Sequence, residues 1–156
     1  MQTPTITFSN YESLAFRFDE IVRQMSRALD ARLFDYDLSR TQWRLLAYVL
    51  KHEGITQSEL ARAADLERAS VGQTIDVMER KQMVERRHAE GDRRVWRIFS
   101  TFKAQALVPE LRIVVDDVFT CMFAGFETGQ DDTLRALLDQ LATNLDCLAS
   151  SHERSN

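Results

Sequence analysis

The sequence predicts a mainly helical α+β fold in which long helices flank a compact centre that carries a small β-hairpin. Apolar residues recur at alternating spacings of three and four along most of the chain, as in amphipathic helices. Between Val84 and Phe99 the period changes to strict alternation, as in paired strands. Before that change, several segments have the capping-box spacing that begins a helix.

The composition fits one ordinary folded unit. The chain has 156 residues, of which 44% are hydrophobic and 28% are charged, values typical of a soluble protein with a single core. No stretch approaches the roughly 18 uninterrupted apolar residues of a membrane span. The first residues have neither the basic start nor the apolar run of a signal peptide. We therefore expect a cytoplasmic protein.

The first predicted helix begins at Ser9, where Glu12 completes a capping box, and ends near Phe34. Its apolar side is formed by residues three and four apart, namely Leu14, Phe18, Ile21, Met25, Ala28, Leu29 and Leu33. A helix of this length with so continuous an apolar side needs a partner helix to cover it.

A second helix is predicted from Thr41 to about Lys51. Ser39 and Gln42 have capping-box spacing at its start, and Gly54 occupies the helix-ending position after it. The side chains expected to point inward are Trp43, Leu46, Ala47 and Leu50.

Two shorter helices follow, joined by a break near Asp65. The third begins at Thr56, with Glu59 three residues later, and its small inward side consists of Leu60, Ala61 and Ala64. The fourth runs from about Arg68 to Lys81, and its inward residues are Val71, Ile75 and Met78. The small side chains of the third helix let another helix cross closely above it. Two helices joined by such a short turn have the form of a helix-turn-helix.

The alternating segment is predicted to form a β-hairpin whose tip is "AEGD", residues 89–92. From Thr101 the helical period returns and continues to Phe126, with a kink expected at Pro109. A last helix is predicted from the spacing of its leucines, which are Leu134, Leu137, Leu138, Leu141, Leu145 and Leu148.

The apolar sides of the outer helices are broad for a monomer of this size. The economical way to bury them is a homodimer in which the terminal helices of two chains interleave, since two-fold dimers are the commonest oligomers. A monomeric helical bundle is the alternative.

Two cysteines, Cys121 and Cys147, lie inside these apolar patterns. They are too few and too badly spaced for a disulfide scaffold or a zinc site, so we expect them in the core. A thiol-based redox-sensing regulator is the alternative, although such a thiol requires solvent and a neighbouring base.

The charge of the chain is unevenly distributed. The formal net charge is −4, yet the segment from Ser39 to Ser100 has twelve Lys or Arg against nine Asp or Glu, and the remainder has eight against fifteen. Such a distribution permits a polyanionic partner that touches only the middle of the chain.

The outward side of the fourth helix suits a DNA major groove. At 100° per residue, Ala69, Gly72, Gln73 and Asp76 point away from the buried stripe, and Arg68 and Ser70 lie at the N-terminal end. Arginine can bind guanine through two hydrogen bonds, and glutamine can pair with adenine or a phosphate. At the start of the third helix, Thr56 and Ser58 can contact phosphates.

The hairpin tip adds a second DNA-binding feature. Arg93 and Arg94 lie on a turn directly after the helix-turn-helix, from which an arginine can reach the negative potential of the minor groove. Asp92 is expected to brace this turn by pairing with Arg94 or Arg86. A solvated hairpin tip without any partner is the alternative.

The segment from Leu38 to Thr101 resembles the MarR family of winged helix-turn-helix regulators. The resemblance rests on "QWRLL", "TQSELA", the "MVERR" that follows the fourth helix and the "DRR" of the hairpin. It implies a winged helix-turn-helix DNA-binding domain over residues 38–100. Residues 1–37 and 101–156 would form a helical, intertwined dimerisation domain.

The resemblance also implies a function. It predicts a homodimeric repressor of its own or adjacent genes that binds a pseudo-palindromic operator, with base contacts from Arg68, Ser70 and Gln73 and minor-groove insertion of Arg94 braced by Asp92. The sequence departs from the family in "STFKA", where Phe102 and Ala104 replace an acidic residue and a glycine.

Many relatives release DNA when a small aromatic or phenolic ligand binds between the dimerisation helices and the winged domain. The candidates for such a site in this chain are Phe16, Trp43, Arg44 and His52. Aromatic residues on an inward side are more often simply core residues.

An enzyme is the opposing class of protein. The three histidines, His52, His88 and His152, lie on a helix end, a hairpin and the C-terminal tail, without a nucleophile or metal ligand at useful spacing. No glycine-rich phosphate loop occurs either. We therefore expect neither catalysis, nor a cofactor, nor a metal. A winged-helix protein-interaction module without sequence-specific DNA binding is the third class.

Overall fold

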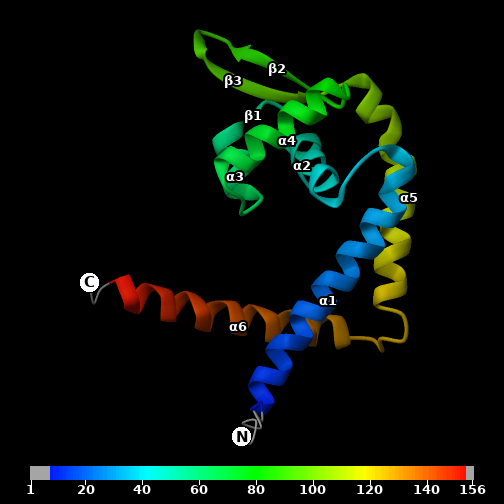
Figure 1. The fold of residues 1–156 in the computed structure, drawn as a ribbon, viewed down its shortest axis with the longest axis vertical. Helices are drawn as coiled ribbons and strands as arrows, with labels where there is room; N and C mark the ends of the chain where they lie inside the picture. The colour runs from blue at the N-terminus through cyan, green and yellow to red at the C-terminus, as the bar shows by residue number, and fades with distance from the viewer. Residues whose placement is uncertain (1–7, 154–156) are drawn as a thin grey trace, which may run out of the picture. The chain divides into compact units, whose positions relative to one another are not determined.

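The computed structural model describes residues 8–153 and divides the chain into two compact units, residues 1–119 and 120–156, which we describe separately. The prediction of a mainly helical fold with a small β-hairpin is confirmed (Figure 1). The elements are α1 (Asn10–Leu33), the short 3-10 helix η1 (Phe34–Tyr36), α2 (Arg40–Lys51), β1 (Ile55–Thr56), α3 (Gln57–Ala63), α4 (Arg68–Arg80), β2 (Val84–Ala89), β3 (Asp92–Ser100), α5 (Phe102–Met122) and α6 (Gln130–Glu153).

All three predicted capping boxes are present. In each, a hydroxyl accepts a hydrogen bond from a backbone N–H three residues on, and that later side chain accepts one from the backbone of the capping residue. The pairs are Ser9 with Glu12 at the start of α1, Ser39 with Gln42 at the start of α2, and Thr56 with Glu59 at the start of α3.

The sheet has three antiparallel strands in the order β1-β3-β2. The sequence predicted the hairpin of β2 and β3, in which Val84 pairs with Ser100 and the register shifts between His88 and Ala89. It did not predict β1, a strand of two residues in which Ile55 pairs with Ile98. This pairing joins the loop after α2 to the base of the hairpin.

The core of the first unit lies between the sheet, α2, α3, α4, the C-terminal part of α1 and one side of α5. On α4 the predicted stripe of Val71, Ile75 and Met78 is fully buried. The other largest fully buried side chains come from six further elements and are Leu33, Leu45, Leu46, Val49, Leu60, Val84, Ile98 and Leu111. Pro109 lies inside α5, which continues to Met122.

The apolar sides of the terminal helices are mostly exposed within the single chain. On α1 only Leu29 and Leu33 are buried, whereas Leu14 and Phe18 are exposed. In the second unit, several leucines of α6 are exposed, namely Leu137, Leu138, Leu141, Leu145 and Leu148. None of the described helices is both long and apolar enough to cross a membrane.

The prediction that the cysteines are core residues is wrong for the single chain. Cys121 and Cys147 are both free and exposed. The reason is that the apolar side chains around them in the sequence, such as Phe123 and Leu145, are exposed as well. The apolar pattern was correct, but the residues of one chain do not cover it.

Candidate nucleic-acid interface and adjoining pocket

Helices α3 and α4 cross at very short distance. The Nε2 atom of Gln57 donates a hydrogen bond to the Arg68 carbonyl at 3.1 Å. A Cβ atom at Gly72 would lie 2.7 Å from that same nitrogen, so glycine allows the Gln57 side chain to reach the start of α4. This contact fixes the first turn of α4 against the helix that precedes it.

The outward side of α4 matches the one predicted from the sequence except at Gly72, which is half-buried and faces the Gln57 side chain. Arg68, Ala69, Ser70, Gln73 and Asp76 are exposed on the side opposite the buried stripe. The helix therefore presents one cation at its N-terminal end, two small residues, one amide and, further along, the carboxylate of Asp76.

The two predicted phosphate contacts on α3 differ in their surroundings. The Thr56 hydroxyl donates to Glu59 Oε2 at 2.7 Å and accepts from the Glu59 N–H at 3.3 Å, so it is occupied by the helix cap. The backbone and side-chain hydrogen bonds from Thr56 hold the pKa of the Glu59 carboxyl below its usual value. Ser58 is half-buried and has no such partner among the described residues.

The brace expected at the hairpin tip is formed by Asp92 and Arg94. The Asp92 carboxylate accepts from the Arg94 backbone N–H at 3.0 Å, from its Nε at 3.1 Å and from its Nη2 at 3.3 Å. These hydrogen bonds, the side-chain ones first, lower the pKa of Asp92. The Arg94 side chain stays 90% exposed. The Arg93 side chain lies outside the part of the structure that is described.

Arg86 does not brace Asp92, which corrects the second half of that prediction. Its Nη1 pairs with Glu79 Oε2 and its Nη2 with Asp76 Oδ1, both at 2.6 Å, and its backbone N–H donates to Glu79 Oε1 at 3.1 Å. The reason is the register, which places Arg86 opposite Ile98, on the side of the hairpin that faces α4. Arg86 therefore ties the hairpin to α4.

Sequence reasoning missed both acidic partners of Arg86 and one aromatic pair. Asp76 and Glu79 are three residues apart on one helix, a spacing that places two carboxylates side by side. The rings of His88 and Trp96 face each other across the hairpin with centroids 3.8 Å apart. The alternating pattern contained a signal for this pair, because His88 before the turn and Trp96 after it lie directly opposite each other on the two strands.

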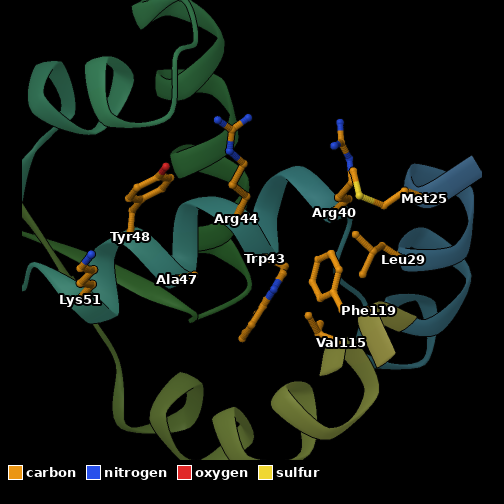
Figure 2. Close-up of a pocket in the computed structure, with 10 residues that line it drawn as sticks. All are labelled: Met25, Leu29, Arg40, Trp43, Arg44, Ala47, Tyr48, Lys51, Val115 and Phe119. Carbon is orange, nitrogen blue, oxygen red and sulfur yellow. The ribbon is translucent and has the colours of Figure 1, made fainter. Parts of the chain in front are cut away.

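A pocket of about 530 Å³ lies between α1, α2 and α5 in the first unit (Figure 2). Its lining residues are Met25, Leu29, Arg40, Trp43, Arg44, Ala47, Tyr48, Lys51, Val115 and Phe119. Figure 2 shows the rings of Trp43 and Phe119 near the middle of the group, with the guanidinium groups of Arg40 and Arg44 pointing to one side.

Two of the four predicted ligand-binding residues, Trp43 and Arg44, line this pocket, and two do not. Phe16 lies too far toward the N-terminal end of α1, where its ring packs on Phe8 with centroids 5.1 Å apart. His52 is the C-cap of α2, where its N–H donates to the Tyr48 and Val49 carbonyls, and it is exposed outside the pocket. The sequence did not reveal that Arg40 and Lys51 would join Arg44 at the rim.

The charge at the rim is unbalanced. Arg40, Arg44 and Lys51 all come from α2, and their side chains form no ion pair with any described residue. An apolar, aromatic pocket with unpaired cations at its edge suits an anion that has an apolar body.

Comparison with known proteins gives consistent results. Residues 36–95 match the family model described as the MarR family. The chain is 25% identical over 135 residues to the HTH-type transcriptional regulator YybA of Bacillus subtilis, covering 82% of this chain and 90% of that protein.

Solved structures show the same fold. The S. aureus MepR–DNA complex has a TM-score of 0.80 at 21% identity and covers 88% of this chain and 99% of that one. A mutant MarR from E. coli complexed with operator DNA has the same TM-score and coverage at 20% identity. From the helix-turn-helix, the braced hairpin and the matching family model, we conclude that residues 36–95 form a winged helix-turn-helix domain of the MarR family and that the chain has the fold of the solved MarR-family structures.

Proposed function

We propose that this protein is a homodimeric regulator that binds a pseudo-palindromic operator in double-stranded DNA and represses its own or adjacent genes. The observation that carries the proposal is the Asp92–Arg94 brace, which presents an almost fully exposed guanidinium beyond the outward side of α4. Recognition by α4 in the major groove and by Arg94 in the minor groove uses both features at once.

The exposed apolar sides of α1 and α6 support the homodimer. Large apolar side chains exposed along a whole helix are unusual in a monomer and mark a surface that is covered in the assembled protein. In a two-fold dimer the two α4 helices would contact half-sites about one DNA turn, roughly 34 Å, apart. The similarity to MepR and MarR, both solved with DNA, agrees with this proposal.

The pocket supports control by a ligand. A small aromatic or phenolic anion would pack against Trp43 while its charge pairs with Arg44. The dimer would exist in two conformations, and in one of them the spacing of the two α4 helices would not match one DNA turn. A ligand that binds this conformation more tightly would shift the population toward it and so release DNA.

The test is a fluorescence-anisotropy titration with DNA from upstream of the gene for this protein, against scrambled DNA, at two salt concentrations. We expect selective, salt-sensitive binding at two chains per site. Arg94→Ala should weaken binding to all sequences and reduce the salt slope by about one. Arg68→Ala should cost about 1 to 3 kcal/mol and relax the preference at one base pair.

Equal losses for both variants on every DNA would contradict the separate roles of Arg68 and Arg94. Weak binding that ignores sequence, repeated with DNA selected from genome fragments, would favour the protein-interaction module instead.

A further inference from the structure

An aromatic pair on the hairpin is not used by the function proposed above. Trp96 is 49% exposed, and its ring lies on that of His88 with an interplanar angle of 33°. Neither the indole N–H nor the imidazole of this pair has a hydrogen-bond partner among the described residues. The chain has two tryptophans, and the other one, Trp43, is buried.

The strand register gives the position of this pair. His88 is opposite Trp96, and Arg86 is opposite Ile98. Because side chains alternate along a regularly paired strand, Trp96 lies on the same side of β3 as Ile98 toward the core, and Arg94 follows two residues nearer the tip, where the register shifts. Along the hairpin, the aromatic pair thus lies between the ion pairs of Arg86 with α4 and the exposed Arg94 guanidinium near the tip.

The charges around the pair favour a polyanion. Asp76 and Glu79, the nearby carboxylates of α4, are paired with Arg86, and Asp92 at the tip is paired with Arg94. These three carboxylates are paired, Glu90 at the tip is exposed without an ion pair to any described residue, and the Arg94 guanidinium remains almost fully exposed. An uncharged peptide would gain nothing from this arrangement, whereas a phosphate strand would.

We propose that the His88–Trp96 pair is a binding site for the sugar–phosphate strand of DNA that passes between the recognition helix and the hairpin. The inference rests on the DNA-binding function proposed above. The indole N–H donates to a phosphate oxygen, and the ring face packs against a deoxyribose. Because the ring–ring contact already restricts both side chains, little side-chain conformational entropy is lost when DNA binds.

The experiment uses tryptophan fluorescence of the full-length protein. Acrylamide, a neutral quencher, reaches exposed Trp96 far better than buried Trp43. We expect the selected operator DNA to protect the protein from acrylamide, and we expect this protection to disappear in Trp96→Phe. Anisotropy measured on the same samples reports whether DNA is bound.

The affinity of variants provides the second readout. Trp96→Ala should weaken operator binding by about tenfold, the loss expected for one hydrogen bond to a charged group. His88→Ala should weaken it less, by roughly threefold, since the indole remains. Val95→Ala is the matched control, because Val95 is adjacent to Trp96 but points to the opposite side of β3. The operator affinity of Val95→Ala should equal that of the wild type.

The outcomes separate the two proposals. Operator binding without any change in Trp96 quenching would overturn the contact and leave the regulator intact. Protection of Trp96 in the DNA-free protein would also overturn it, because another chain would then cover the pair. No selective binding of any DNA would overturn both. If Trp96→Ala does not fold, the quenching measurement on the wild type and Trp96→Phe decides alone.

Discussion

At the scale of single residues, Gly54 joins the sheet to the end of α2. Its φ is +79°, its N–H donates to the Ile98 carbonyl at 2.9 Å, and an added Cβ would lie 3.0 Å from the Phe99 ring. We expect Gly54→Ala to lower the free energy of unfolding by about 1 to 3 kcal/mol, because backbone strain and crowding add. Urea denaturation measures this loss.

The control for Gly54 is Gly91 at the hairpin tip. Its φ is +81°, but nothing lies within 4 Å of the position of an added Cβ. Gly91→Ala therefore reports the backbone strain alone. If both variants lose the same free energy, the contact with Phe99 has no part in the requirement for glycine at position 54.

A second prediction at the residue scale concerns Glu59 and pH. Thr56 lowers the pKa of Glu59 in the folded protein, so the cap stabilises the fold above the pKa of the unfolded chain and this contribution is lost as the pH falls through the folded pKa. Thr56→Ala should move the Glu59 pKa only part of the way back, since the backbone hydrogen bond at 2.9 Å remains. Titration of the Glu59 carboxyl by NMR measures this shift. Ser58→Ala should leave it unchanged.

At the scale of elements, Arg86 joins the hairpin to the recognition helix. Arg86→Ala removes both ion pairs and leaves Asp76 and Glu79 unpaired beside the proposed path of DNA. We expect operator affinity to fall by about tenfold or more, since two uncompensated carboxylates repel phosphates. The loss of unfolding free energy should be only about 1 kcal/mol, because Asp76 is 54% and Glu79 39% exposed to screening solvent. Anisotropy and urea denaturation measure the two effects.

Two further variants test this interpretation of Arg86. Changing Asp76→Asn and Glu79→Gln in the Arg86→Ala background should restore part of the affinity by removing the repulsion. Arg87→Ala is the control, because Arg87 pairs only with Glu85 of its own strand and stacks on Phe99. A similar loss for Arg87→Ala would show that only the net charge of the hairpin matters.

The elements also show what sequence can predict. Helix starts were predictable because a capping box is local, and the Asp92–Arg94 brace was predictable because the two residues are two apart. The strand β1 and the true partners of Arg86 were not, because both depend on contacts between distant segments. Periodicity places a side chain on one side of an element, but it does not say which element lies there.

The same limit applies at the scale of the whole molecule. The apolar patterns of α1 and α6 predicted that a partner covers these helices, and Leu14 and Leu145 are exposed in the chain itself. The pocket was predicted in part for the same reason. Trp43 and Arg44 were candidates because the family resemblance implied a ligand near α2, whereas Phe119 and Met25 join them only through the packing of α1 and α5.

The homodimer gives the prediction at this scale. Leu145→Glu on α6 should raise the dissociation constant of the dimer by at least about tenfold, since burying a leucine contributes about 1.5 to 3 kcal/mol and an uncompensated charge would take its place. Sedimentation velocity over a range of protein concentrations measures the change. Gln140→Glu adds the same charge outside the leucine pattern, on an exposed side chain that bonds Asn144, and should leave the dimer intact.

The DNA affinity of Leu145→Glu then tests the link between assembly and recognition. A single chain carries one α4 helix and one hairpin, so it contacts one half-site. We expect the variant to lose most of its preference for the full operator over an isolated half-site, while each half-site is still bound weakly. If Leu145→Glu is monomeric and keeps full operator affinity, the spacing of two α4 helices does not determine operator binding. A ligand in the pocket then could not release DNA by changing that spacing.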